Sequence, residues 1–192
     1  MPTDARTHEG LRLAFLSYVE TEKGLAGRGA ALVTDHVTRP LEFRCTTPIK
    51  PNPVQRTLYG ETLRSYIVVD LVGGPLIDAI QEKPQVVIVQ DVSFLELRPK
   101  IPYYLVCLGK QGEQFRAPSM NHPKQESTDP GVLVCDSGKF QPLTSITHWK
   151  HSSELTAILD VLRPVFAVVD LLEPFARIEK AVAEVDRQQP LR

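Results

Sequence analysis

Hydrophobic and polar positions follow two different spacings along this chain of 192 residues. Residues 11–19 and 41–45 alternate with a period of two, so that Leu41, Phe43 and Cys45 face one way while Glu42 and Arg44 face the other. Such alternation is typical of a strand with one exposed face. The small and branched residues at 29–34 (GAALVT) predict a further strand between these two. The first part of the chain is therefore predicted to form three antiparallel strands.

A helical spacing begins after Asn52, a residue type that caps helices, and Pro53, which is favoured in the first turn. The apolar positions that follow recur at intervals of three to five residues, at Val54, Leu58, Leu63, Ile67 and Leu71. This pattern predicts one long helix with an apolar face. The Gly-Gly-Pro sequence at 73–75 is expected to break it, leaving a second short helix at 76–81.

Two unbroken apolar runs, at 85–89 and 103–108, predict strands that are covered on both faces. Because helical segments separate them from earlier strands, parallel pairing is expected, with 85–89 next to 11–19. The runs 132–135 and 140–147 flank a turn-forming tetrapeptide and predict a hairpin. The predicted fold class is therefore α/β, with a mixed sheet of three antiparallel strands followed by parallel strand-helix units.

The chain is expected to form one α/β domain over 11–150, preceded by a disordered segment at 1–10 and followed by a helical segment at 151–192 packed on it. The polar stretch 109–130 is expected to be a flexible loop. The helical segment carries a long apolar stripe, which must be buried by the domain or by a second copy. The stripe consists of Val165, Phe166, Val169, Leu172, Phe175, Ile178 and Val182.

Composition places few limits on function. The net charge is −1, so no global field attracts nucleic acid, and the N-terminus lacks the apolar core of a signal peptide. Three cysteines, Cys45, Cys107 and Cys135, are expected to be buried, reduced thiols. These features favour a cytoplasmic protein. The residues 39–64 nevertheless hold more basic than acidic side chains and offer a nucleic-acid-binding face, formed by Arg39, Arg44, Lys50, Arg56 and Arg64.

His148 and His151 follow Cys135 at a spacing that zinc ligands can have, but a structural zinc site needs four ligands and no Cys-x-x-Cys pair is present. Ordinary histidines without a metal are expected at these positions. No metal ligand is assigned from this pattern.

Four stretches of the chain resemble endonuclease V, a family of the ribonuclease H-like superfamily. They are GAALVTD, LYGETLRSY, PQVVIVQD and IPYYLVCLGK, and the resemblance covers Leu11 to Lys110. The resemblance implies a ribonuclease H-like fold. It also implies that acids from the first strand, the first helix and the fourth strand converge on a divalent metal, typically magnesium.

Carried onto this chain, the resemblance makes Asp91 the fourth-strand acid, while Ser17 stands where the first strand should carry an aspartate. Glu20, at the end of that strand, and Glu61, in the helix, are the other candidate catalytic acids. Glu61 lies well inside the predicted helix, about 12 Å from its start at 1.5 Å per residue. The acid set is therefore incomplete in the pattern that the family uses.

The segments LEFRCTTPIKPNPVQRTLYGETL and DLLEPFARIEKAV also resemble proteins of planctomycete bacteria that carry no assigned activity. The main interpretation is a non-catalytic ribonuclease H-like domain without a cofactor. It would serve as an interaction module in a bacterial cytoplasmic assembly and bind another protein or a second copy through its C-terminal helices. One alternative is a magnesium-dependent nuclease that uses Glu20, Glu61 and Asp91, and another is a nucleic-acid-binding protein that uses the basic face.

Overall fold

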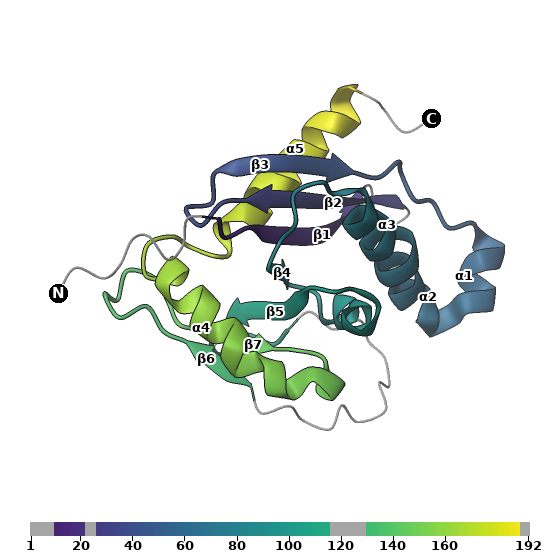
Figure 1. The fold of residues 1–192 in the computed structure, drawn as a ribbon. Coiled ribbons are helices and arrows are strands. Elements are labelled where there is room, and N and C mark those ends of the chain that lie inside the picture. Colours follow the sequence, from purple (N-terminus) through teal and green to yellow (C-terminus); the bar gives the residue numbers. More distant parts are fainter. Residues whose placement is uncertain (1–9, 22–25, 116–129, 189–192) are drawn as a thin grey trace.

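The computed structural model describes residues 10–21, 26–115 and 130–188, which form one mixed sheet of seven strands (Figure 1). The order across the sheet is β3-β2-β1-β4-β5-β7-β6. The strands are β1 (Leu13–Thr21), β2 (Ala26–Thr34), β3 (Pro40–Cys45), β4 (Val86–Val89), β5 (Tyr104–Lys110), β6 (Gly131–Leu133) and β7 (Leu143–Ile146). Residues 1–9 of the segment 1–10, which was predicted to be disordered, and most of the predicted loop 109–130 lie outside the described residues.

The strand pairing confirms the predicted sheet. β1 and β3 both pair antiparallel with β2, whereas β4 lies between β1 and β5 and is parallel to both. Leu13 is opposite Val86 and Phe15 is opposite Ile88 in the β1–β4 pair. All four residues of β4 are buried, as expected for a central strand with covered faces. The predicted hairpin is also present, as the antiparallel pair of β6 and β7.

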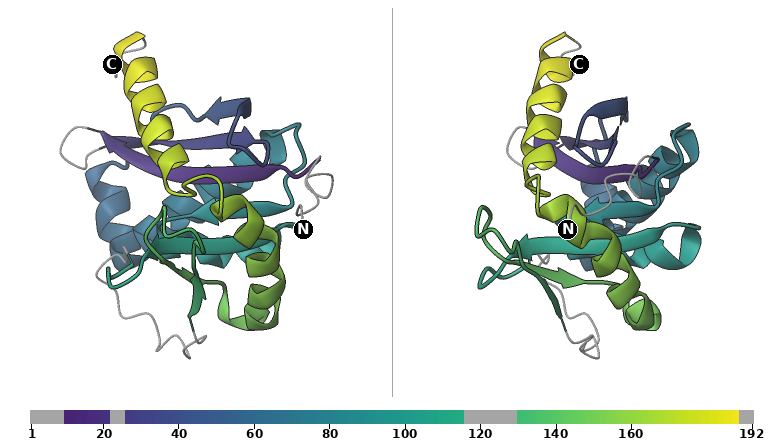
Figure 2. Two further views of the ribbon diagram at one scale, coloured as in Figure 1. Left: turned by 90° about the vertical axis from the view of Figure 1, so that its left-hand side faces the viewer. Right: turned by 60° about the vertical axis from the view of Figure 1, so that its left-hand side comes forward.

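Helices cover both faces of the sheet (Figure 2). One face packs against α4 (Leu155–Phe166) and α5 (Glu173–Gln188). The other packs against the later part of a run of helical segments that connects β3 to β4 and against the 3-10 helix η4 (Val92–Lys100). That run consists of α1 (Pro53–Tyr59), η2 (Gly60–Thr62), α2 (Leu63–Ser65), the π-helix η3 (Tyr66–Gly73) and α3 (Gly74–Ala79). Within the described residues, no helix has both the length and the apolar character needed to cross a membrane.

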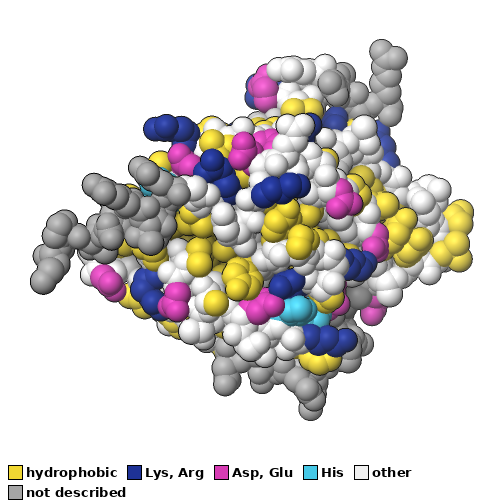
Figure 3. Space-filling view, viewed as in Figure 1, with side chains coloured by type: hydrophobic (Ala, Val, Ile, Leu, Met, Phe, Trp, Pro, Cys, Tyr) yellow, Lys and Arg dark blue, Asp and Glu magenta, His cyan; other side chains and the backbone are white. Residues whose placement is uncertain are grey.

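The prediction of one long helix from Pro53 is wrong at its beginning. α1 ends at Gly60, whose φ of 50° is a left-handed conformation that glycine adopts without steric cost. The chain turns there, and α1 stands away from the sheet. As a result Val54 and Leu58 are 64% and 78% exposed, and hydrophobic side chains are visible on the surface over α1 at the right of Figure 3.

The expected break at Gly73-Gly74-Pro75 is also absent. Gly73 and Gly74 both have right-handed helical dihedral angles, and the Gly74 amide donates to the carbonyl of Val69, five residues earlier. The chain therefore passes through a wide π-helical turn instead of stopping. Pro75 is tolerated because it lies in the first turn of α3, where a missing N–H costs little.

The apolar stripe of the C-terminal segment packs on the sheet of the same chain. Phe175 is 3% exposed, and Ile178 and Val182 are fully buried. The Phe175 ring meets the Phe15 ring of β1 edge to face, with the centroids 5.6 Å apart. The stripe is thus buried by the domain itself, which is one of the two predicted possibilities, and is part of the core.

The cysteines are distributed over the sheet, with Cys45 on β3, Cys107 on β5 and Cys135 just after β6, and each is a free thiol. Burial raises the pKa of Cys107 well above its ordinary value, and the nearby Asp91 carboxylate acts in the same direction. Cys107 is therefore an unreactive core side chain.

Candidate active site

A cleft of about 520 Å³ opens where the neighbouring parallel strands β1 and β4 end. Its lining includes Ser17, Glu20, Arg64, Gln90, Asp91 and Glu179. These side chains come from β1, from the helical run, from the end of β4 and from α5. The carboxyl ends of parallel strands are where α/β folds commonly place ligands, because helices cover the faces but leave these ends open.

Arg64 of α2 lies at the centre of the polar contacts in this cleft. Its Nε and Nη2 both donate to Asp91 Oδ2, at 3.1 and 2.6 Å, and its Nη1 donates to Glu20 Oε1. The other carboxylate oxygen of Asp91 accepts the backbone amide of Ser93 at 2.9 Å, which caps η4. The guanidinium therefore bridges two acids that come from different strand ends.

The surroundings keep Arg64 charged. Burial acts to lower the pKa of Arg64, but the carboxylates of Asp91 and Glu20 outweigh burial and raise it. The guanidinium carbon also lies 5.5 Å from the centroid of the Tyr18 ring, a cation–π distance. Burial and the charge of Glu20 raise the pKa of Tyr18, against the opposing charges of Arg64 and Arg56, so its hydroxyl stays protonated.

The structure brings two of the three candidate acids together. Glu20 and Asp91 line the cleft, whereas Glu61 is exposed in the turn η2 and does not line it. Arg64, one helical turn further on, points into the cleft in place of Glu61. The sequence had marked Arg64 as a basic surface residue, and its pairing with Asp91 depends on the position of the helix against the end of β4.

One of the predicted basic residues, Arg39, lies apart from the cleft. Arg39 directly precedes β3, which runs parallel to β1, so Arg39 is at the opposite end of the sheet from the cleft. Arg44 pairs with Glu42 at 2.7 Å. Arg56 donates from Nε to the carbonyl of Pro51 at 3.1 Å.

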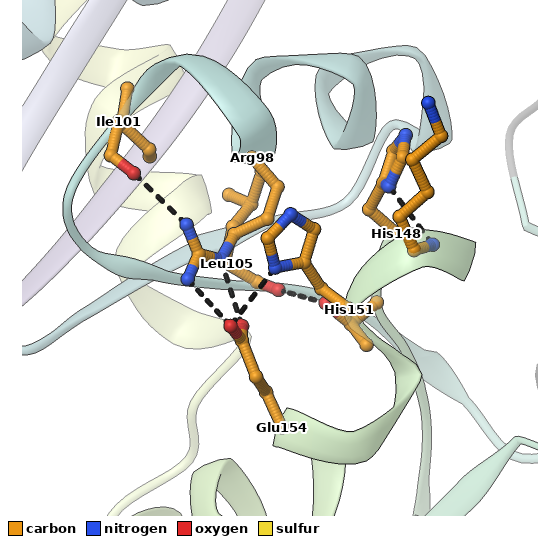
Figure 4. A network of polar contacts seen from close by, with 8 residues as sticks. Arg98, Ile101, Leu105, His148, His151 and Glu154 are labelled. Carbon is orange, nitrogen blue, oxygen red and sulfur yellow. Dashed lines mark hydrogen bonds and ion pairs between the residues drawn. The ribbon is translucent and has the colours of Figure 1, made fainter.

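A second polar network joins η4 to the start of α4, away from the cleft (Figure 4). The Arg98 guanidinium donates to both carboxylate oxygens of Glu154, at 2.8 and 2.7 Å, and His151 Nδ1 lies 2.9 Å from Glu154 Oε1. His148 is buried, and burial lowers its pKa. These contacts give both histidines a structural setting in the interface between the two segments.

The cleft residues, as they are arranged, do not fit the magnesium site that the resemblance implies. The first strand presents the hydroxyl of Ser17 instead of a carboxylate. A guanidinium occupies the position between Glu20 and Asp91, where a cation would need their oxygen atoms. Within the described part of the chain, no group of three or more His, Cys, Asp or Glu side chains could hold a metal ion.

The predicted fold class, α/β with a mixed sheet, is confirmed, and the fold resembles that of a solved endonuclease V structure. The chain is similar to the crystal structure of human ENDOV, an endonuclease V, with 13% sequence identity and a TM-score of 0.52, over 98% of this chain and 89% of that one. It is also similar to endonuclease V from Bacillus subtilis, at 11% identity and a TM-score of 0.46, over 94% and 83%. Endonuclease V from Ciona intestinalis, solved with DNA containing an inosine, matches at 8% identity and a TM-score of 0.38, over 76% and 75%.

No protein-family model matches the chain, and no curated protein matches its sequence significantly. The structural matches nevertheless correct the main interpretation from the sequence. A non-catalytic interaction module is contradicted, because the matched human structure is an endonuclease V, and this match favours the nuclease alternative instead. The apolar stripe of the C-terminal helices is not available to a partner, because it is buried in the core of the same chain.

Proposed function

We propose that this chain acts on nucleic acid as a nuclease, with the cleft formed by Glu20, Arg64 and Asp91 as its active site. The observation that carries the proposal is the position of Arg64, between two carboxylates in an open cleft at the ends of two parallel strands. An anion-binding side chain next to acids is the combination that phosphodiester hydrolysis can use. The fold shared with endonuclease V structures supports the same reaction class.

Arg64 is the group that would bind the phosphate. A guanidinium presents a planar set of N–H donors that match two phosphate oxygens, and it remains charged at any physiological pH. We expect a phosphate oxygen to replace Glu20 Oε1 as the acceptor of Arg64 Nη1. Asp91, which accepts from Nε and Nη2, would keep the guanidinium oriented during this exchange.

Glu20 is the candidate general base. Its side chain is 49% exposed, so water can reach it, and binding of a phosphate to Arg64 would release its carboxylate. A water oxygen then attacks phosphorus, its proton passes to Glu20, and the bond from phosphorus to the leaving oxygen breaks. The leaving oxygen takes a proton from solvent, and the two products are a phosphate-ended strand and a hydroxyl-ended strand.

The test is a cleavage assay on labelled single-stranded and double-stranded DNA and RNA, including DNA that contains an inosine, with Mg²⁺, with Mn²⁺ and with a chelator. We expect strand cleavage by the unaltered protein. Glu20→Gln should lower the rate by about 10²-fold or more, because the variant cannot accept the proton. Glu61→Gln is the matched control, since Glu61 is an exposed acid outside the cleft, and its rate should be unchanged.

Two results would contradict the proposal. One is the absence of cleavage of every substrate under all three conditions by a protein that is folded by circular dichroism. The other is a Glu20→Gln variant with the full rate, which would place the activity in another site or in a contaminating enzyme.

A further inference from the structure

We infer that Arg64 takes the place of a divalent cation in this cleft, because its guanidinium neutralises Glu20 and Asp91 and excludes a metal ion from between them. The inference concerns the site of the proposed function. It is tested by metal binding alone, so absence of nuclease activity would not decide it.

The contacts show how fully the acids are engaged. Asp91 Oδ2 accepts two N–H groups of Arg64, at 3.1 and 2.6 Å, and Asp91 Oδ1 accepts the Ser93 amide at 2.9 Å. Glu20 Oε1 accepts a hydrogen bond from the remaining terminal nitrogen of Arg64, Nη1. Magnesium prefers carboxylate and water oxygens in a near-octahedral arrangement, at about 2.0–2.1 Å. A metal ion could bind both acids only after the guanidinium had left.

The position of Arg64 is also fixed by its neighbours. Its side chain is only 29% exposed, and the guanidinium lies 5.5 Å from the centroid of the Tyr18 ring. The π-helix that directly follows α2 is anchored in the core through Val68, Val69 and Val72. Displacing Arg64 would leave a half-buried positive charge without its partners, which is costly.

Charge explains what removal of the arginine would do. Glu20 and Asp91 carry two negative charges, and Glu179 also lines the cleft, while Arg64 supplies the positive charge that pairs with the first two. Without Arg64, two close carboxylates would repel each other and face the solvent in the cleft. Close carboxylates with open positions for water are a setting in which divalent cations bind.

The experiment is titration calorimetry with Mn²⁺, without nucleic acid, on the unaltered protein and on Arg64→Ala. We expect Arg64→Ala to bind one Mn²⁺ at least about tenfold more tightly, since affinity for divalent cations rises with the uncompensated charge of the ligands. The double variant Arg64→Ala with Asp91→Asn should lose this increase in Mn²⁺ affinity. Arg12→Ala is the matched control, because Arg12 pairs with Glu82 at 3.1 Å outside the cleft. The Mn²⁺ affinity of Arg12→Ala should equal that of the unaltered protein.

Arg64→Met serves as a second variant, because it keeps an apolar stem beside Tyr18 if Arg64→Ala does not fold. The inference is overturned if the unaltered protein binds one Mn²⁺ as tightly as either variant. It is also overturned if Asp91→Asn leaves the affinity of Arg64→Ala unchanged, since the gained ion would then lie elsewhere.

Discussion

Gly73 and Gly74 offer a sharp test of the packing that positions the helical run against the sheet. Both glycines have right-handed helical dihedral angles, so alanine suits the backbone at either position. Their surroundings differ. A Cβ atom at Gly73 would lie 2.8 Å from Leu97 Cδ2 and 2.9 Å from the carbonyl oxygen of Val68, whereas at Gly74 the nearest atom is the carbonyl oxygen of Val69, at 3.5 Å.

The magnitudes follow from this difference. Alanine is favoured over glycine inside a helix by about 0.8–1.0 kcal/mol, and this gain applies equally to Gly73→Ala and Gly74→Ala. Overpacking of a filled core costs about 1–3 kcal/mol, and it applies only to Gly73→Ala, because Leu97 is fully buried and the Val68 carbonyl belongs to the backbone. Gly73→Ala should therefore unfold with a free energy about 1–3 kcal/mol lower than that of Gly74→Ala.

The assay is urea unfolding of both variants and of the unaltered protein, followed by circular dichroism. Similar slopes with denaturant would show that the three proteins unfold from equally compact states, so that the midpoints compare stability directly. Gly74→Ala should lie above the unaltered protein and Gly73→Ala below Gly74→Ala. Equal midpoints for the two variants would refute the close approach of η3 to η4.

Two further predictions concern the C-terminal helices and the network of Figure 4. Phe175→Ala should lower the free energy of unfolding by about 3–5 kcal/mol without changing the mass measured by sedimentation. Val168→Ala, at a site that is 57% exposed, should change the free energy of unfolding by less than about 0.5 kcal/mol. A change in mass with no loss of stability in Phe175→Ala would show an interface instead of a core. Burial acts to raise the pKa of Glu154, but Arg98 and His151 outweigh burial and lower it. The ionised carboxylate therefore stabilises the fold above the unfolded-state pKa of about 4.3, and this stabilisation is lost as the pH falls through the lowered pKa of the folded state. Urea unfolding between neutral and acidic pH should show that Glu154→Gln loses less stability on acidification than the unaltered protein, and parallel curves would contradict this role.

The sheet could be predicted from the sequence because its signals are local. The alternation at Leu41 to Cys45 indicates a strand, although Leu41 and Phe43 stay 39% and 37% exposed in β3 at the edge of the sheet. The unbroken run in β4 indicates two covered faces, and all four of its residues are buried. The order of strands and helices then restricts the pairing, since a strand that returns through a helix lies parallel to an earlier one. The helical period of the C-terminal stripe could likewise be read from the sequence. The sequence did not show which surface would cover that stripe.

Only the tertiary structure decided the path of the helical run and the pairing of charged side chains in the cleft. Gly60 turns the chain and leaves Leu58 in solvent, although the spacing of apolar residues continues through both. The glycines at 73 and 74 stay helical, and at Gly73 the helical run approaches Leu97 of η4 too closely for a side chain. Arg64 pairs with residues 27 and 44 positions away, and the sequence alone does not define that pairing, which depends on how a helix lies against two strand ends. Long-range pairing of charged side chains leaves no periodic signal, because each partner is locally an ordinary surface residue.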